Sequence, residues 1–413
     1  MALASAVAGC AATLPPVPGK GGPAWRELTS EHFTMWTDAE VGRARELVGD
    51  MERMRQIIVG VAFPRAPVNG KILVIAFADD AELIRFSRTK EPRAFARAAQ
   101  APLWQPMVVL SAFSNLRNQD ETLTHELTHA ISFSAVKHQP RWLSEGMATY
   151  FETLQLDRRR TSIDVGVAPM NRGERRRMPH LVSIATLFGW QGNSDYAVEQ
   201  RLYGTGWALF TFLVNEHRNE LARYLELLDA SRGPPKETMV DRGRRVWSEA
   251  VPSLPLSAVD EELHQWLMSG HHTVLHFNLQ GQQWPITESN VGDADVYALR
   301  AMLLAMAGRE ADARASIQEA LSVEPNHVMA TLVGALYYKD KLDVTPEIGR
   351  TVAAAHPDDW RAWLLAVLAL SRAEGESPEE QAAEAKVCEL IAKNPGVVSP
   401  VTTCGDDPPA VSQ

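Results

Sequence analysis

The chain has 413 residues, of which 45% are hydrophobic, and a formal net charge of −10. This length and content suffice for two or three globular domains and exclude a largely disordered chain. The acidic balance disfavours nucleic acid as a partner, because such binders usually carry a basic face, and the absence of an 18-residue apolar run predicts no transmembrane helix.

Residues 1–24 are predicted to be a signal remnant followed by a linker. Met1 to Gly9 is apolar and small, and Val7-Ala8-Gly9-Cys10 is typical of the site at which bacterial lipoproteins receive a lipid. The tract from Pro15 to Pro23 would then be a tether. The segment before Cys10 has no basic residue and is short for an export signal. The resemblance of Val7 to Cys10 to a lipidation site nevertheless leads us to expect a cell-envelope protein, lipid-anchored at Cys10 or periplasmic, while the short uncharged start keeps a cytoplasmic chain as the alternative.

Strand and helix signals alternate over the next hundred residues. Runs rich in β-branched residues predict strands, and one amphipathic stretch predicts a long helix. The predicted strands are His32–Thr37, Lys71–Ala78 and Met107–Ala112, and the predicted helix is Ala39–Val59. This mixture predicts an α+β lobe.

The most specific motif of the chain is His125-Glu126-Leu127-Thr128-His129. Asp120 can cap a helix that opens at Glu121, and Leu123, Leu127, Ala130 and Ile131 give this helix a buried apolar stripe with the helical period. On one face of this helix, His125 and His129 can reach the same tetrahedral zinc ion, with Glu126 beside them facing a bound water.

A second helix is predicted to begin near Pro140 and to carry Glu145, sixteen residues after His129. Its apolar surface would pack it against the first helix through Met147, Ala148, Tyr150 and Phe151. This packing would bring Glu145 to the metal.

The segments Thr124 to His129 and Trp142 to Tyr150 resemble the two motifs of the gluzincin zinc metallopeptidases, and in particular the peptidase-MA-like group of bacterial proteins. The resemblance implies a catalytic domain over residues 25–275, built from a small sheet, the HExxH helix and a helical lobe. It also implies that Zn²⁺ is bound by three side chains, with Glu126 as general base; the ligands would be His125, His129 and Glu145.

The same resemblance points to further site residues. A tyrosine hydroxyl often stabilises the oxyanion in gluzincins, and Tyr203, just before a predicted helix, is the first candidate, with Tyr196 second; the alternative for Tyr203 is a half-buried core residue. The position four residues after the third ligand often supports a ligand imidazole. Here it is Thr149, a weaker partner than a carboxylate.

Substrate binding is implied only in outline. In gluzincins the strand before the HExxH helix pairs with an extended substrate, and Val108 to Ser111 would play that part unless it is an ordinary strand. The Gly-x-Met-Glu-Asn type of motif that holds a free amino terminus is missing, which favours an endopeptidase over an aminopeptidase. Two arginine clusters, Arg158 to Arg160 and Arg172 to Arg177, could meet an anionic substrate group but are more typical of a solvated loop.

Residues 285–396 are predicted to form an α-helical repeat module. Ala294 to Pro325 resembles a tetratricopeptide helix pair with Gly308 at its turn, and further helices are predicted at His327–Lys339, Asp359–Ala373 and Glu379–Lys393. The module could dock a protein partner or stiffen the catalytic domain; the alternative is a plain helical appendage. Cys388 and Cys404 could form a disulfide or remain two unrelated thiols. The tail, residues 397–413, is predicted to be disordered.

Two functions therefore remain open. The first is a zinc-dependent peptidase of the cell envelope that acts on peptides or proteins. The second is a non-catalytic envelope scaffold that keeps the gluzincin fold for binding.

Overall fold

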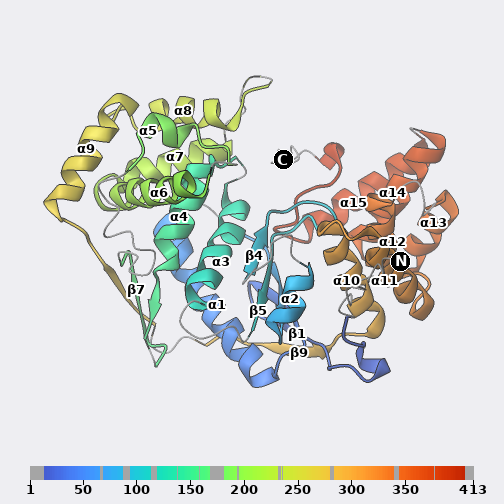
Figure 1. Ribbon diagram of the computed structural model, residues 1–413. Coiled ribbons are helices and arrows are strands. Elements are labelled where there is room, and N and C mark those ends of the chain that lie inside the picture. The colour runs from blue at the N-terminus through green and yellow to red at the C-terminus, as the bar shows by residue number, and fades with distance from the viewer. Residues whose placement is uncertain are drawn as a thin grey trace, which may run out of the picture.

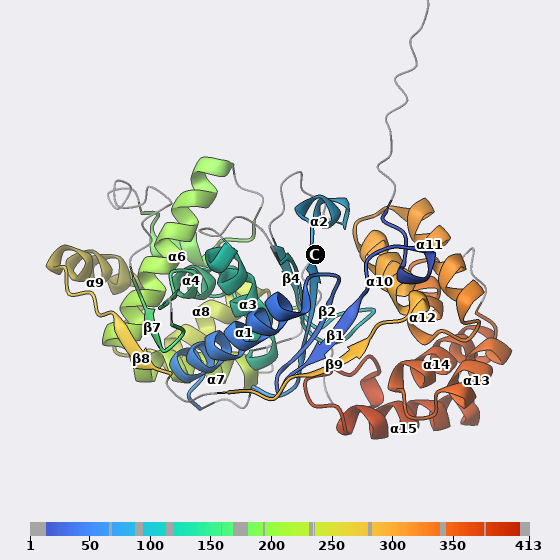
Figure 2. The ribbon, with the colours of Figure 1, turned by 90° about the horizontal axis from the view of Figure 1, so that it is seen from below.

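The computed structural model describes residues 14–404 apart from 66–67, 87–93, 113–118, 137, 158, 168–180, 193–194, 231–233, 235, 280–282, 339–343 and 376. At its centre lies a mixed sheet made of β1 (Arg26–Thr29), β2 (Phe33–Thr37), β3 (Ile72–Phe77), β4 (Ala94–Arg97), β5 (Met107–Ser111) and β9 (Thr287–Asn290). The strand order is β4-β5-β3-β2-β1-β9. Helices cover both faces of the sheet (Figure 1 and Figure 2). The predicted α+β class is confirmed.

The elements predicted before the HExxH motif are all present, with ends shifted by no more than three residues. The predicted strands correspond to β2, β3 and β5, and the predicted helix corresponds to α1 (Val41–Ala62). β3 is buried along its whole length. This position explains its unbroken apolar sequence, because neither face of a strand that is covered on both sides contacts solvent.

Alternate residues of the strands point to opposite faces of the sheet. On one face, Val74 and Val108 pack in a core with α1 and with α3 (Gln119–Ala135), the helix that carries the HExxH motif. On the other face, Ile75 and Val109 pack against helices from the C-terminal part of the chain. The sheet thus lies between the HExxH helix and the C-terminal helices, as Figure 2 shows.

The strand nearest in sequence to the HExxH helix is not at the edge of the sheet. β5 pairs with β3 in parallel and with β4 in antiparallel orientation, and all of its residues are buried. The prediction that Val108 to Ser111 pairs with an extended substrate is therefore wrong. The strand at this edge is β4, whose short sequence, Ala94 to Arg97, lacks the apolar run that made β5 recognisable.

A lobe of helices follows α3 and contains α4 (Arg141–Glu152), α5 (Ile184–Phe188), α6 (Tyr196–Glu216), α7 (Arg218–Ala230), α8 (Met239–Ala250) and α9 (Leu256–Ser269). α4 begins beside Pro140, as predicted. α3 begins at Gln119, so Asp120 lies inside the helix and the predicted cap position is wrong. α4 crosses α6 at close range: a Cβ atom on Gly146 would lie 2.5 Å from the carbonyl oxygen of Gly206.

A small second sheet lies beside this lobe. Its strands are β6 (Gln155–Leu156), β7 (Ser162–Val165) and β8 (Leu275–Asn278), in the order β6-β7-β8. β8 follows α9 directly, so this sheet joins the start and the end of the helical lobe (Figure 1).

The C-terminal part of the chain forms a module of paired helices, which are α10 (Asp293–Met306), α11 (Glu310–Val323), α12 (Val328–Tyr337), α13 (Pro346–Ala355), α14 (Trp360–Glu374) and α15 (Pro378–Ala392). The helix pair predicted over residues 294–325 is confirmed as α10 and α11, and Gly308 takes a left-handed conformation at their turn, with φ 78°. Sequence analysis missed α13, although Thr345 caps it and Pro346 is its first residue. α13 packs against α14, and α14 packs in turn against α15.

The module packs directly on the central sheet. Leu299 and Met302 of α10 and Val333 of α12 share one core with Ile75 and Val109 of the sheet. In addition, α2 (Asp80–Phe86), which follows β3, contacts α10. The module is therefore fixed against the central sheet through both contacts.

The boundary predicted between the two domains runs through the sheet. β9 lies inside the predicted module of residues 285–396, yet it pairs with β1 in antiparallel register. The segment that leads into α10 therefore belongs to both units. None of the described helices has the length and apolar character needed to cross a membrane.

The Pro- and Gly-rich tract is packed rather than free where the structure describes it. Val17 is fully buried, Gly19 donates a backbone hydrogen bond to Asp293 at 3.0 Å, and Lys20 pairs with Glu319 at 2.8 Å. The prediction of a tether is wrong for these residues, because they cover α10 and α11. Cys10, the predicted lipid site, lies outside the described residues.

The predicted disordered tail is also packed up to residue 404. The backbone amide of Val398 donates to the carbonyl oxygen of Trp104 at 2.7 Å, and Ser399 is buried. Cys388 of α15 forms a disulfide with Cys404, which ends a short 3₁₀ helix (Thr402–Cys404). The disulfide prediction is confirmed, and residues 405–413 lie outside the described part.

Candidate metal centre

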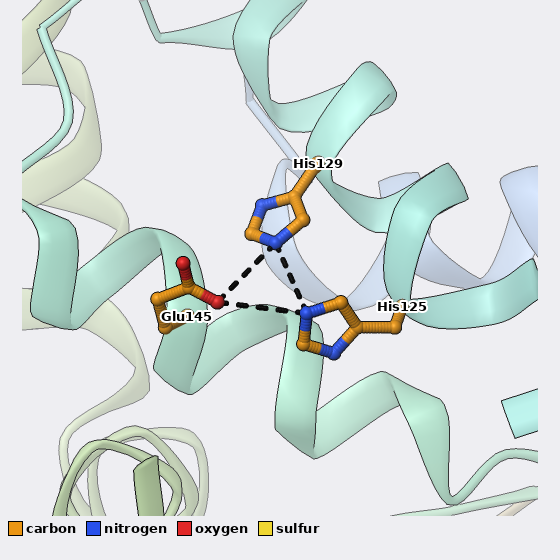
Figure 3. Close-up of side chains that lie close together, drawn as sticks. All are labelled: His125, His129 and Glu145. Carbon is orange, nitrogen blue, oxygen red and sulfur yellow. Dashed lines mark hydrogen bonds and ion pairs between the residues drawn. The ribbon is translucent and has the colours of Figure 1, made fainter. Parts of the chain in front are cut away.

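Two helices bring the three predicted ligands together. His125 and His129 lie one turn apart on α3, on the side opposite the apolar stripe that packs against the central sheet. Glu145 comes from the first half of α4, whose residues Met147 and Tyr150 are fully buried. Figure 3 shows the three side chains pointing at one another from these two helices.

The distances between the facing atoms suit one metal ion. The two Nε2 atoms are 3.1 Å apart, and Oε2 of Glu145 lies 3.5 Å from Nε2 of His125 and 3.4 Å from Nε2 of His129. Ligands about 2.0–2.1 Å from a tetrahedral zinc ion are separated by roughly 3.3 Å. In addition, Oε2 of Glu145 is buried and accepts no hydrogen bond from any described residue. The donor set and its spacing therefore fit a zinc-sized divalent cation.

Electrostatics in the metal-free site follow from the same geometry. Burial opposes the charged forms, but the two imidazoles hold the pKa of Glu145 well below its usual range. Burial likewise opposes protonation of His125, yet the carboxylates of Glu145 and Glu152 raise its pKa to about 10. A cation that binds at these atoms would therefore compete with a proton.

Each ligand imidazole has a partner on its far nitrogen. Oε2 of Glu152 accepts a hydrogen bond from Nδ1 of His125 at 2.9 Å, because an ionised carboxylate can only accept. Nδ1 of His129 lies 2.9 Å from Oγ of Ser144. Both contacts leave the Nε2 atoms facing the position of the metal. Such partners orient ligand imidazoles and increase their basicity.

Thr149 does not take the supporting role considered for it. Its side chain is fully buried, but Oγ1 has no hydrogen-bond partner among the described residues. The supporting residue is Glu152, which sequence analysis missed. The signal was present: Glu152 follows Glu145 by seven residues, which is two helical turns, so both carboxylates lie on one side of α4.

Glu126 lies beside the ligands and contacts the edge of the central sheet. The backbone amide of Ala96, in the edge strand β4, donates to Oε2 of Glu126 at 2.7 Å. Both residues line a cavity of about 550 Å³ that opens in front of the metal position. The apolar part of its lining comes from Phe133, Pro140, Phe188, Met239 and Val240.

Of the two tyrosine candidates, only Tyr203 lines this cavity. Its ring centre lies 6.5 Å from that of His125 and 5.1 Å from that of Trp190. Tyr203 belongs to the second turn of α6, so the prediction that it precedes the helix is wrong. Tyr196, the first residue of α6, is 78% exposed and is not part of the cavity lining, which removes it as a candidate.

Arg141 is a further residue of the cavity that sequence analysis did not single out. Nη2 of Arg141 lies 3.6 Å from Oε1 of Glu145, and its guanidinium lies over the ring of Trp190, 4.9 Å from the ring centre. The arginines considered from the sequence lie elsewhere: Arg160 pairs with Asp50 of α1 at 2.7 Å, Arg159 is exposed, and Arg158 and residues 172–177 lie outside the described part.

The comparison with protein families agrees with this delimitation of the site. Residues 120–236 match a family described as "Protein of unknown function (DUF1570)". The match spans α3, α4 and α6, and of the site and cavity residues named above only Ala96, Met239 and Val240 lie outside it, as do the central sheet and the helical module. No curated protein matches the chain. This family carries no assigned activity.

Proposed function

We propose that the protein is a zinc-dependent peptidase of the gluzincin type. The observation that carries the proposal is the convergence of His125, His129 and Glu145, whose facing atoms lie 3.1 to 3.5 Å apart, with a second carboxylate, Glu126, in the same cavity. A purely structural ion cluster would not need an open cavity or a further carboxylate facing it.

His125, His129 and Glu145 would hold the ion and leave its fourth position toward the cavity. Zn²⁺ bound there would lower the pKa of a water molecule toward ~7 and polarise the scissile carbonyl. Glu126 would take a proton from this water and pass it to the leaving amine. Tyr203 would donate a hydrogen bond to the oxygen on which negative charge develops.

The edge strand β4 offers a binding position for the backbone of a substrate. β4 ends the central sheet, and the amide of Ala96 points toward the cavity, where it meets Glu126. An extended peptide added to this edge would lie across the metal position, in the manner of β-strand addition. Among the described residues that line the cavity, the acidic side chains are Glu126 and Glu145, which are already assigned to the base and the ion. No further carboxylate in this lining is left to hold a free amino terminus, which favours an endopeptidase over an aminopeptidase.

We place the enzyme in the cell envelope. The disulfide between Cys388 and Cys404 supports an oxidising compartment, because such bonds rarely persist in a reducing cytosol. Metabolic labelling with a fatty-acid probe tests the anchor. Label that is lost in Cys10→Ala would establish lipidation, whereas an exported protein without label would be periplasmic and not lipid-anchored.

The test of the function compares the wild-type chain with Glu126→Gln and, as a control on the same helix, Glu121→Gln. Zinc content and cleavage of a broad peptide library are measured for each. We expect one zinc per chain in all three proteins and cleavage that falls about 10²- to 10⁴-fold only in Glu126→Gln. Zinc without cleavage in the wild type would support the non-catalytic scaffold instead, and a chain that binds no zinc would overturn the metal site.

A further inference from the structure

The cavity contains one strong cation beside the metal position. Arg141 is the only Lys or Arg among the described residues that line it. Arg141 contacts Oε1 of Glu145, whose other oxygen faces the two imidazoles. Because an extended residue spans about 3.3–3.6 Å, the guanidinium lies within reach of one or two substrate residues from the metal position.

The guanidinium is held in place by its surroundings. It lies over the ring of Trp190 at 4.9 Å, and Trp190 is fixed by edge contact with Tyr203 and by a hydrogen bond from its Nε1 to Glu199 at 3.3 Å. Gly192 makes room for it: a Cβ atom there would lie 3.3 Å from Nη1 of Arg141. These contacts therefore hold the planar guanidinium of Arg141 in one orientation before a substrate binds.

The hydrogen-bonding capacity of Arg141 is unused among the described residues. A guanidinium offers five N–H donors, but the contacts of Arg141 with Glu145 and Glu199 are ion pairs at 3.6 and 4.0 Å, beyond hydrogen-bond distance. A metal ion bound to Glu145 would neutralise part of the carboxylate charge that now faces Arg141. Because neither carboxylate is within hydrogen-bond distance, the fork can still bind a further planar anion, such as a substrate carboxylate, through two parallel hydrogen bonds.

We propose that Arg141 is a specificity-determining residue that binds a carboxylate of the substrate next to the scissile bond. The apolar side chains of Phe133, Phe188 and Met239 would contact the remainder of the same substrate residue. This inference rests on the proposed peptidase function. The carboxylate can be the free carboxyl terminus of a peptide or the side chain of an aspartate or glutamate, and both offer the same planar group to the guanidinium.

The first part of the test measures binding and needs no turnover. Calorimetry on the zinc-loaded full chain compares a dipeptide hydroxamate that ends in a free carboxylate with its carboxamide. We expect the carboxylate form to bind the wild type about 10- to 100-fold more tightly, and the two forms to bind Arg141→Met equally. Arg141→Lys, which keeps the charge without the fork, should fall between them. The exposed Arg223→Met is the control and should keep the wild-type preference.

The second part identifies the source of the carboxylate. Cleavage is compared for peptides with a free carboxyl terminus, the same peptides as carboxamides, and carboxamides with Asp or Glu near the scissile bond. Selective cleavage of the first set assigns the carboxyl terminus, and selective cleavage of the third assigns an acidic side chain.

The outcomes separate the two proposals. Equal binding of both hydroxamates, together with cleavage that ignores carboxylates and is unchanged in Arg141→Met, would overturn the role of Arg141 and leave the peptidase intact. A carboxylate preference that depends on Arg141, in a chain that cleaves no peptide, would support the binding site and overturn the peptidase.

Discussion

The carboxylate of Glu152 and the imidazole of His125 are joined by a hydrogen bond of 2.9 Å that runs from α4 to α3. α4 therefore supplies one ligand, Glu145, and also the group that orients another. A displacement of α4 relative to α3 would disturb two of the three ligands at once. The metal site thus depends on how α4 is packed, not only on the HExxH sequence.

The first prediction concerns Glu152 itself. Glu152→Gln keeps the size of the side chain but removes the charge that orients and polarises His125. We expect zinc affinity to fall about 10- to 100-fold, as is usual when such a partner is lost. Competition with a chromophoric chelator measures the affinity.

Thr149→Val is the matched control for this prediction. Thr149 lies on the same helix and is equally buried, but its hydroxyl has no partner among the described residues. We expect unchanged zinc affinity and equal or greater stability, because an unsatisfied buried hydroxyl is lost. If both variants bound zinc equally well, Glu152 would have no role in holding the metal.

The second prediction concerns the crossing of α4 and α6. In Gly146→Ala the new methyl group would meet the carbonyl of Gly206 at 2.5 Å, and backbone cannot move aside as a side chain can. We expect a loss of about 1–3 kcal/mol in the free energy of unfolding, together with weaker zinc binding, because Glu145 is the neighbouring residue.

Gly204→Ala is the control for the second prediction. A Cβ atom on Gly204, also within α6, would meet nothing within 4 Å. This variant should be neutral or slightly more stable, because alanine favours a helix over glycine by up to about 1 kcal/mol. Urea unfolding of the two variants would refute the packing argument if their midpoints shifted alike.

Local patterns account for what could be predicted from the sequence. His125 and His129 are positioned by one helix, so their spacing alone predicted their approach. Glu145 required the packing of two helices, and the apolar face of α4 made that packing predictable. The Arg141 contact with Trp190 joins residues 49 positions apart, one at the start of α4 and the other just after α5, and no local pattern encodes it.

Long-range pairing explains the errors. β4 was missed because four residues of an edge strand carry little periodic signal, and its place beside Glu126 follows only from pairing with β5. The Pro- and Gly-rich tract resembles a free linker in composition, but Val17 is buried against α10 and α11 by contacts from the far end of the chain. Such contacts depend on the tertiary fold, so the sequence around Val17 contains no local pattern that predicts them.

The third prediction concerns Tyr203. In Tyr203→Phe the ring packing against Trp190 is kept and only the hydroxyl is lost. If this hydroxyl stabilises the oxyanion, kcat for a cleaved peptide should fall about 10²- to 10³-fold, while zinc content stays the same. Tyr196→Phe, on the exposed first turn of α6, should leave kcat unchanged. Equal activity of Tyr203→Phe and the wild type would assign Tyr203 to the packing of the cavity wall.

The last prediction concerns a buried charge cluster between the sheet and the module. Glu82 of α2 and Arg300 of α10 lie 3.5 Å apart and are both almost fully buried. Burial and the nearby carboxylate of Asp38 raise the pKa of Glu82 from 4.5 to about 7, against the opposing effect of Arg300. The folded state therefore keeps a proton on Glu82 in a pH range in which the unfolded chain has released it.

The sign of the effect on stability follows from this difference. The contribution of Glu82 to stability is fully present below about pH 4.5 and is lost as the pH rises to about 7, because ionisation then favours the unfolded chain. Between pH 5 and pH 8 the wild type should lose about 2–3 kcal/mol relative to Glu82→Gln, which cannot ionise. Urea unfolding of both proteins in the presence of a chelator measures the difference without a contribution from bound metal. A constant difference between the two proteins across this range would mean that Arg300 keeps Glu82 ionised in the folded state, and the module would then be held to the sheet by a buried ion pair.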